Sequence, residues 1–252
     1  MTQTPSAAPL AASRALEEII AIAQTHQPPD KFTHDRLERE AKSSISINAP
    51  FSYATLGALE SISGNEELMD SYHKNSIKLS NSSHMHMNYA GSLNQVLRLK
   101  EAAEQARIGA SLAPDDLEAI RKAIKYTLQS GGITMAASMV DAYRKLSPTD
   151  ASSYEHLLKT SSLLKTARID DDEIIQLFQI TCDFLRNKKI YHTEQDIITD
   201  EEEEGFISLC FNLNLTNEEI WNLNRHLFEI MFDQVPNQSP NLSVRFGRSH
   251  AA

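Results

Sequence analysis

Cysteine is scarce in this chain, whose 252 residues include only Cys182 and Cys210. The two have no paired spacing, so neither a disulfide framework nor a zinc knuckle follows from them. Both lie among apolar residues, so we expect buried, inert thiols. Long apolar runs are missing as well, and no stretch reaches the roughly 20 apolar residues of a membrane-spanning helix. Residues 1–9 lack the basic and apolar regions of a signal peptide, so we expect a soluble, cytoplasmic protein.

Motifs of common enzymes are also missing. The sequence contains no Gly-x-Ser-x-Gly, His-Glu-x-x-His or Cys-His signature. The glycines of Ser130-Gly131-Gly132 suit a turn between helices and not a strand-to-helix loop that binds phosphate. No acid, base and nucleophile can be assembled from neighbouring residues. We therefore predict a protein that is not an enzyme and that needs no cofactor.

Basic residues are fewer than acidic ones, at 24 against 34, and the formal net charge is -10. A field of that sign repels phosphate backbones, which argues against general nucleic-acid binding. A basic partner would suit such a charge, but many cytosolic proteins are acidic without one. Hydrophobic residues make up 41% of the chain, as in ordinary soluble proteins that bury a core.

One short phrase occurs twice at an interval of 34 residues. It reads Leu-Ala-Pro-Asp-Asp at residues 112–116 and Leu-Ser-Pro-Thr-Asp at residues 146–150. Proline cannot continue a helix, and aspartate is a favoured residue at a helix start. Each phrase is therefore predicted to end one helix, after which Asp116 or Asp150 caps the next.

Apolar residues recur at helical spacing on both sides of these phrases. The predicted helices cover residues 10–25, 33–44, 51–63, 66–79, 87–97, 100–111, 117–129, 133–146, 152–166 and 170–187. Gly64 and Gly131 stand at expected helix ends, where a left-handed backbone is common. Asn65 is expected to cap the helix that follows Gly64. Much of the chain is therefore predicted to form consecutive helical hairpins.

Residues 50–150 resemble the tetratricopeptide repeat family in their 34-residue period and closing proline. Further matching features are the pairs Gly57 and Gly91, Ala102 and Ala136, and the first-helix aromatics Tyr53 and Tyr89. The resemblance implies a mainly α fold in which helical hairpins stack into a right-handed superhelix. The alternative is an ordinary helical bundle with a coincidental repeat, which explains the agreement of prolines, caps and helices less well.

In proteins that this segment resembles, the first helices of successive units line a groove that holds a peptide or partner helix. In this chain the groove residues are expected to be Tyr53, Asn88, Tyr89, Leu93, Arg121 and Lys125. Together with Lys122, the last two would make the groove locally basic despite the acidic total.

The periodicity changes after Lys189. Apolar and polar residues alternate over residues 207–215, which predicts a strand with one buried face, and residues 189–198 are a plausible partner strand. Thr216 to Glu219 has the form of a capping box, so a helix is expected next, followed by a strand at residues 242–246. The helix would cross between two parallel strands, and the small sheet would pack on the preceding helices.

The expected organisation is therefore a disordered segment at residues 1–9, a repeat domain at 10–187 and a small α+β segment at 188–252. Two local strings are open to more than one interpretation. His84-Met85-His86-Met87 has soft ligands for copper, but ordinary packing at a turn is favoured, and we predict no metal site. The acidic run from Asp200 to Glu204 lacks the ligand spacing of a calcium loop, so a solvated hairpin turn is favoured over calcium or a basic peptide.

The sequence thus predicts a protein–protein interaction protein that acts as an adaptor, a specialised chaperone or an assembly factor. The alternative is a regulatory or sensory module, or an oligomerisation module, in which the C-terminal sheet binds a ligand or another chain. In that alternative, Leu242 to Phe246 would present a sheet edge for pairing. The sequence leaves the partner's identity and the oligomeric state open.

Overall fold

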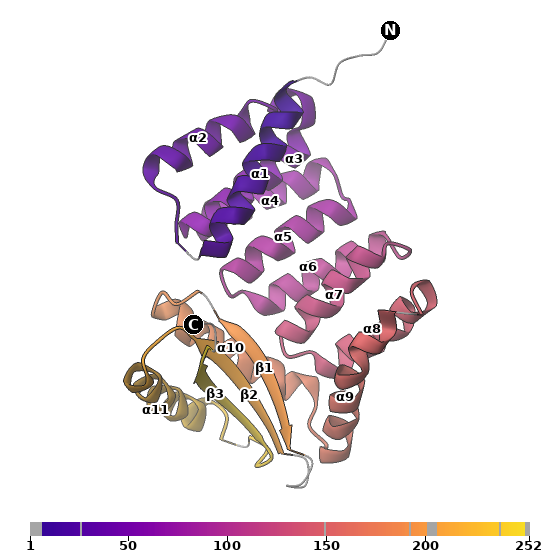
Figure 1. Cartoon of the computed structure of the whole chain (residues 1–252), viewed down its shortest axis with the longest axis vertical. Helices are drawn as coiled ribbons and strands as arrows, with labels where there is room; N and C mark the ends of the chain where they lie inside the picture. Colours follow the sequence, from indigo (N-terminus) through magenta and orange to yellow (C-terminus); the bar gives the residue numbers. More distant parts are fainter. Residues whose placement is uncertain are drawn as a thin grey trace. The chain divides into compact units, whose positions relative to one another are not determined.

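The computed structural model describes residues 7–25, 27–148, 150–191, 193–200, 206–236 and 238–249. Over these residues the chain forms eleven α-helices, one short 3-10 helix and a three-stranded sheet (Figure 1). The predicted fold class, helical hairpins followed by a small C-terminal sheet, is confirmed. By packing, the chain divides into two compact units, residues 1–122 and 123–252, and each is described by itself. The segment predicted to be disordered, residues 1–9, lies mostly outside the described residues.

The first unit is a series of antiparallel helix pairs. Its helices are α1 (Ala7–Thr25), α2 (Lys31–Lys42), α3 (Ile45–Ser63), α4 (Glu66–Leu79), α5 (Ser83–Gln95), α6 (Leu99–Leu112) and the first part of α7 (Leu117–Gln129). Helix α3 packs on α4 and α5 on α6, while α1 and α2 both pack against α3. Gly64 ends α3 with a φ of 78°, and the side chain of Asn65 accepts a hydrogen bond from the first turn of α4, as predicted.

Helix α3 begins six residues before the predicted start. Pro50 lies inside it, and Asn48 has a φ of -143°, so a short helical turn is joined to the regular helix across a kink. The Asn48 side chain accepts a hydrogen bond from the backbone of Phe51, at 3.4 Å. Proline is tolerated in the first turn of a helix, where its missing N–H would have no partner. The regular part of α3 therefore starts close to where the sequence placed it.

The 34-residue period is visible in the helix bounds themselves. The first and last residues of α7 and α8 (Ile133–Leu146) each stand 34 positions after the first and last residues of α5 and α6. Asp116 accepts hydrogen bonds from the first turn of α7, at 2.9 and 3.2 Å, as predicted. The side chain of Asp150 lies outside the described residues. The repeated phrase therefore separates equivalent helical hairpins.

The second unit contains the last helices and the sheet. Its further elements are η1 (Asp150–Tyr154), α9 (Glu155–Ala167), α10 (Asp171–Asn187), β1 (Glu194–Asp200), β2 (Phe206–Leu213), α11 (Asn217–Gln234) and β3 (Leu242–Arg248). Gly131 has a φ of +94°, and a Cβ there would lie 3.1 Å from the backbone of Ile174, so α10 approaches this turn closely. The Asp171 carboxylate accepts hydrogen bonds from Thr134 and Met135 in the first turn of α8, at 2.9 and 2.8 Å. The start of α10 thus caps α8.

The sheet has the order β1-β2-β3, with β1 antiparallel and β3 parallel to β2. Helix α11 makes the crossover between β2 and β3, so the predicted strand-strand-helix-strand order is confirmed. The predicted capping box at the start of α11 is present. The apolar face of the sheet packs on α10, where the rings of Phe178 and Phe211 are 4.9 Å apart and those of Phe184 and Phe246 are 5.8 Å apart. Of the acidic run that connects β1 and β2, residues 201–204 lie outside the described residues.

Strand β2 is buried on both faces, whereas the sequence predicted one buried face. Its polar residues have partners: Asn212 donates to the Asp196 carboxylate at 2.5 Å, and the Cys210 thiol donates to Asn212 at 3.3 Å. A central strand is flanked on both sides, which shields its short polar side chains from solvent. Both cysteines are free and buried. The prediction that both thiols are buried is confirmed. Burial raises the pKa of Cys210 and raises that of Cys182 to about 12, which disfavours the reactive thiolate.

Candidate interaction surfaces

A polar network joins the helices inside the first unit. The Asp70 carboxylate of α4 accepts hydrogen bonds from the Tyr89 hydroxyl of α5 and from Arg98 at the start of α6, each at 2.8 Å. Arg98 also donates to Glu101, at 2.7 and 2.5 Å. Burial acts to raise the pKa of Asp70, but the hydrogen bonds from Arg98 and Tyr89 outweigh it and lower that pKa. These side chains therefore hold α4, α5 and α6 together.

A buried histidine explains why Gly57 is needed. His73 of α4 is inaccessible to solvent, and burial lowers its pKa to about 3, so the ring is neutral. Its Nε2 lies 2.8 Å from the Ser92 hydroxyl, and its ring stacks on Tyr89 with a centroid distance of 4.9 Å. A Cβ at Gly57 would lie only 2.5 Å from this ring. Helices α3 and α4 therefore approach each other closely at Gly57.

Three of the six predicted groove residues lie inside the helix pairs. Tyr89 and Leu93 are buried in a cluster with Met69, so their assignment as groove residues is wrong. Tyr53 is half-buried, and its ring stacks on Tyr72 of α4 at 6.1 Å. The repeat period marks which helices are equivalent. It does not fix which side of each helix is open, because one residue along a helix turns the side chain by about 100°.

Asn88 belongs to a narrow open face of α5. This face, the α5 open face, consists of His84, Asn88, Gly91 and Gln95, which stand on successive turns and are at least partly accessible. The His84 ring stacks on Phe51 of α3, with a centroid distance of 6.3 Å. The Asn88 Nδ2 atom has no hydrogen-bond partner among the described residues. That atom is buried, so this face offers the accessible part of the Asn88 side chain beside an aromatic pair.

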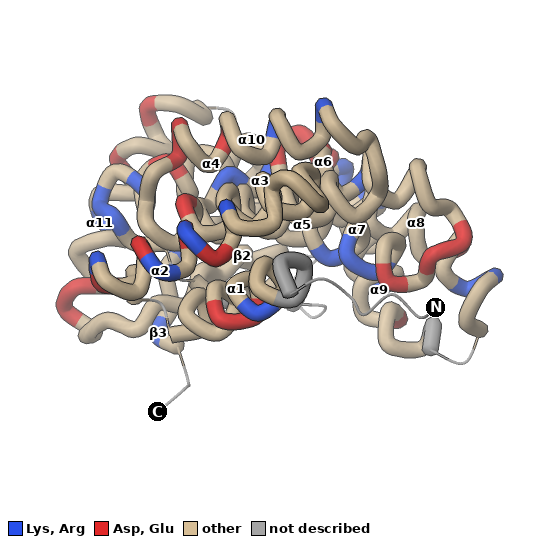
Figure 2. The backbone as a smooth tube through the Cα atoms, turned by 90° about the horizontal axis from the view of Figure 1, so that it is seen from above, with Lys and Arg blue, Asp and Glu red and all other residues tan. Residues whose placement is uncertain are grey.

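Arg121 and Lys125 lie on the solvent side of α7, together with Lys122. Glu118 accepts a hydrogen bond from Arg121 and lies 3.6 Å from the Lys122 ammonium. Three cations and one carboxylate leave this side, the α7 open face, positive. The basic and acidic positions along the backbone of α7 are coloured in Figure 2. Lys122 is the residue 34 positions after Asn88, so the two occupy equivalent places on successive first helices.

The His84–Met87 string lies within α5, which begins four residues before the predicted start, and not at a turn. His86 is buried, with Nδ1 2.7 Å from the Gln105 amide oxygen and Nε2 2.8 Å from that of Asn81. The Met85 sulfur accepts a hydrogen bond from Ser76 at 2.9 Å. In the described part of the chain, no group of three or more His, Cys, Asp or Glu residues is placed to hold a metal ion. The string serves packing.

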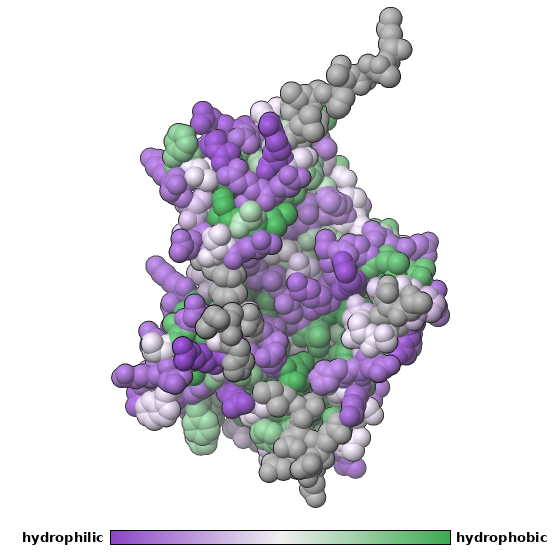
Figure 3. Space-filling view, in the orientation of Figure 1, coloured by the Kyte–Doolittle hydropathy of each residue, from purple (hydrophilic) through white to green (hydrophobic). Residues whose placement is uncertain are grey.

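Helix α11 exposes aromatic residues that the sequence did not single out as surface residues. Phe228 follows the buried Leu227 at a position that an amphipathic pattern would place near the core, but 71% of it is exposed. Trp221 and Phe232 are also exposed, at 62% and 72%. The face that does pack on the sheet consists of Ile220, Leu223, Leu227 and Met231. In the region of α11, hydrophobic side chains reach the surface (Figure 3). The sequence did contain a signal for this exposed face: Phe228 and Phe232 stand seven and eleven residues after Trp221, which is helical spacing.

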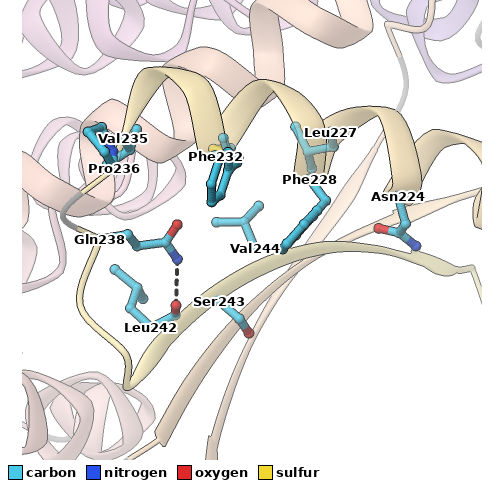
Figure 4. A pocket seen from close by; sticks show the side chains of 11 residues that line it. Asn224, Leu227, Phe228, Phe232, Val235, Pro236, Gln238, Leu242, Ser243 and Val244 are labelled. Carbon is cyan, nitrogen blue, oxygen red and sulfur yellow. Dashed lines mark hydrogen bonds between the residues drawn. The ribbon is translucent and has the colours of Figure 1, made fainter.

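A cavity of about 340 Å³ lies between α11 and β3. Phe228 and Phe232 project into it from α11 toward Val244 of β3 (Figure 4). The outer edge of β3 is bonded by the chain's own amides. Asn224 bonds both the backbone N–H and C=O of Phe246, at 2.7 and 3.0 Å, and Gln238 donates to the C=O of Leu242 at 2.5 Å. These bonds oppose the alternative in which this edge pairs with another chain.

No protein-family model matches the sequence, and no curated protein matches it. One solved structure, described as the functional characterization of PilF from Pseudomonas aeruginosa, is similar over 74% of this chain and 94% of that chain. The two are 14% identical, with a TM-score of 0.41, and a likeness at that level carries no argument about function. None of the described helices is long and apolar enough to cross a membrane.

Proposed function

We propose that this chain is a non-enzymatic interaction protein that binds an extended segment of another protein. The binding surfaces are the α5 open face and the α7 open face. The observation that carries the proposal is the exact 34-residue repetition of the α5–α6 hairpin in α7–α8. Repetition places accessible side chains at equivalent positions on successive first helices, and such positions form the binding surface of helical-repeat proteins. An adaptor, chaperone or assembly factor needs a surface of this kind.

The chemistry of the two faces suggests what the bound segment contains. The Asn88 side chain is partly accessible and suits contact with an extended peptide. Arg121 and Lys122 suit carboxylates, because the α7 open face has three cations against the single carboxylate of Glu118, with which both are paired. Acidic residues farther away than a Debye length of about 8 Å at physiological salt matter little here. The segment is therefore proposed to be extended and acidic, with carboxylates near α7.

Quantitative affinity purification of the full chain tests this proposal. Reversing two charges in Arg121→Glu/Lys122→Glu should remove the main bound protein, and Asn88→Ala should weaken its binding. The matched control is Lys74→Glu/Lys78→Glu, which makes the same change of charge on exposed positions of the second helix α4. The control should retain the partner. Equal retention by both charge-reversal variants, or equal loss, would refute the assignment of the binding surface to α5 and α7.

A second candidate function is oligomerisation through the C-terminal segment. The exposed aromatic residues of α11 favour this function. Because the outer edge of β3 is already hydrogen-bonded within the chain, the proposed contact between copies is made by α11 and not by the sheet edge.

A further inference from the structure

The exposed side of α11 carries a stripe of four large residues, Trp221, Arg225, Phe228 and Phe232. Their spacings of four, three and four residues place them on one side of the helix. The three aromatic residues are 62% to 72% exposed, and the Arg225 guanidinium lies over the Trp221 ring at 5.3 Å. This side borders the face that packs on the sheet, since Phe228 and Phe232 also line the cavity against β3. Large exposed apolar patches commonly mark interaction sites.

The spacing of the α11 stripe is the same when it is read from either end. A two-fold axis that passes between His226 and Leu227 would make α11 antiparallel to its copy. Trp221 would then face Phe232 of the second copy, and Arg225 would face Phe228 of the second copy. Each pair occurs twice, which is the property of a closed two-fold interface. We propose that the α11 stripe is a homodimer interface, in which Trp221 of each copy inserts beside Phe232 into the other copy's cavity.

The cavity between α11 and β3 suits this insertion. It opens beside the second half of α11, where Phe228 and Phe232 form its wall (Figure 4). Antiparallel packing brings the first half of the second copy's helix to this place, and that half carries Trp221. The volume of about 340 Å³ is at the lower end of the range of about 300–1,000 Å³ that accepts small ligands, which is enough for an indole ring.

The exposed area agrees with a dimer of ordinary size. Aromatic side chains bury about 150–250 Å² each, so three that are about two-thirds exposed supply roughly 300–500 Å² per copy. A stable interface buries about 800 Å² per partner, so the stripe would form the apolar centre and its polar neighbours the rim. Charges at the rim are complementary: the antiparallel arrangement brings Arg225 next to Glu229 of the second copy.

The chain's only tryptophan is Trp221, so one residue both makes the contact and reports it. Sedimentation equilibrium of the full chain should show a dimer, and the tryptophan emission should shift to shorter wavelength as concentration rises. Trp221→Ala and Phe232→Ala should each raise the dissociation constant at least tenfold, as expected for buried aromatic residues at the centre of an interface. The matched control is Phe32→Ala, which removes an equally exposed aromatic side chain, 75% accessible, from α2.

A charge swap adds a readout that does not depend on removing bulk. Arg225→Glu should weaken the dimer, and Arg225→Glu/Glu229→Arg should restore part of the loss. A wild-type chain that stays monomeric at about 100 μM would overturn the proposal, since even a weak interface is then occupied. So would a dimer that survives Trp221→Ala, or one that is lost equally in Phe32→Ala. None of these results bears on the affinity of a single α5 and α7 site for a peptide free in solution, because the stripe is on a different element.

Discussion

The substitution Gly57→Ala tests the packing that holds the first unit together. The added Cβ would lie 2.5 Å from Cδ2 and 2.6 Å from Nε2 of His73. The ring has no free direction of movement, because it stacks on Tyr89 and its Nε2 is held by the Ser92 hydroxyl. Gly57→Ala must therefore push α3 away from α4 or break the bond between His73 and Ser92.

The expected change in the free energy of unfolding has a definite sign. Forcing an extra carbon atom into a well-packed core costs about 1–3 kcal/mol. Loss of the His73–Ser92 hydrogen bond costs about 1 kcal/mol more. Replacing glycine by alanine inside a helix returns about 1 kcal/mol through helix propensity. The net expectation is a loss of about 2 kcal/mol, whereas a site with open space would gain about 1 kcal/mol.

Urea unfolding followed by circular dichroism at the helix band measures this change. The double variant Gly57→Ala/His73→Ala should show a smaller loss than the sum of the two single losses, because the truncated side chain leaves room for the methyl group. Gly109→Ala in α6 is the control, since the nearest atoms there are the flexible end of Met87, at 3.0 Å, and the backbone oxygen of Ser83, at 3.1 Å, both farther than the His73 ring is from Gly57, and we expect a smaller loss. A Gly57→Ala chain as stable as the wild type would refute the close contact between α3 and α4.

Two other predictions follow from the same contacts. Asp171→Ala should lower the free energy of unfolding by about 1–2 kcal/mol, because two backbone N–H groups of α8 lose their acceptor. Thermal melting measures this, and the neighbouring Asp172→Ala should change little. The neutral state of His73 should make stability depend on pH. The unfolded chain protonates this residue near pH 6.5 and the folded chain only near pH 3, so the free energy of unfolding should fall by about 1.4 kcal/mol per pH unit below 6.5. His73→Gln should show a shallower fall in urea titrations between pH 7 and pH 4, and an equal slope would contradict the buried neutral ring.

The repeat could be predicted because a period is a property of the sequence alone. Prolines, capping residues and small residues recur at fixed intervals whatever their surroundings, so the helix pairs and the cap at Asp116 followed directly. The open side of each helix could not be predicted in the same way. Helix α5 has apolar or small residues around most of its circumference, since it packs against α3, α4 and α6. The position of Tyr89 is therefore set by contacts distant in sequence, which a single-helix pattern does not contain.

Helix α11 is a second case in which the sequence does not determine which side of a helix is buried. Its apolar residues cover a wide arc, and a simple amphipathic stripe would bury Phe228 with Leu227. The sheet is only three strands wide in the described part of the chain, so it covers just part of that arc and leaves Phe228 and Phe232 at the rim of the cavity. Local sequence determined the helix and its capping box. The width of the sheet determined which aromatic residues stay exposed.

The two proposed surfaces together make a further prediction about binding strength. A dimer formed through α11 carries two copies of the α5 and α7 open faces, so it can engage two segments of an oligomeric or surface-bound partner. The second contact then forms at a high effective concentration, and avidity can exceed the single-site affinity by about 10²–10⁴ when the geometry allows both contacts. Trp221→Ala should therefore reduce binding to a densely immobilised partner peptide. It should leave the affinity for the same peptide free in solution unchanged, because the binding residues on α5 and α7 are intact. A loss of solution affinity in this variant would mean that α11 contacts the peptide directly, and the separation of the two surfaces would be wrong.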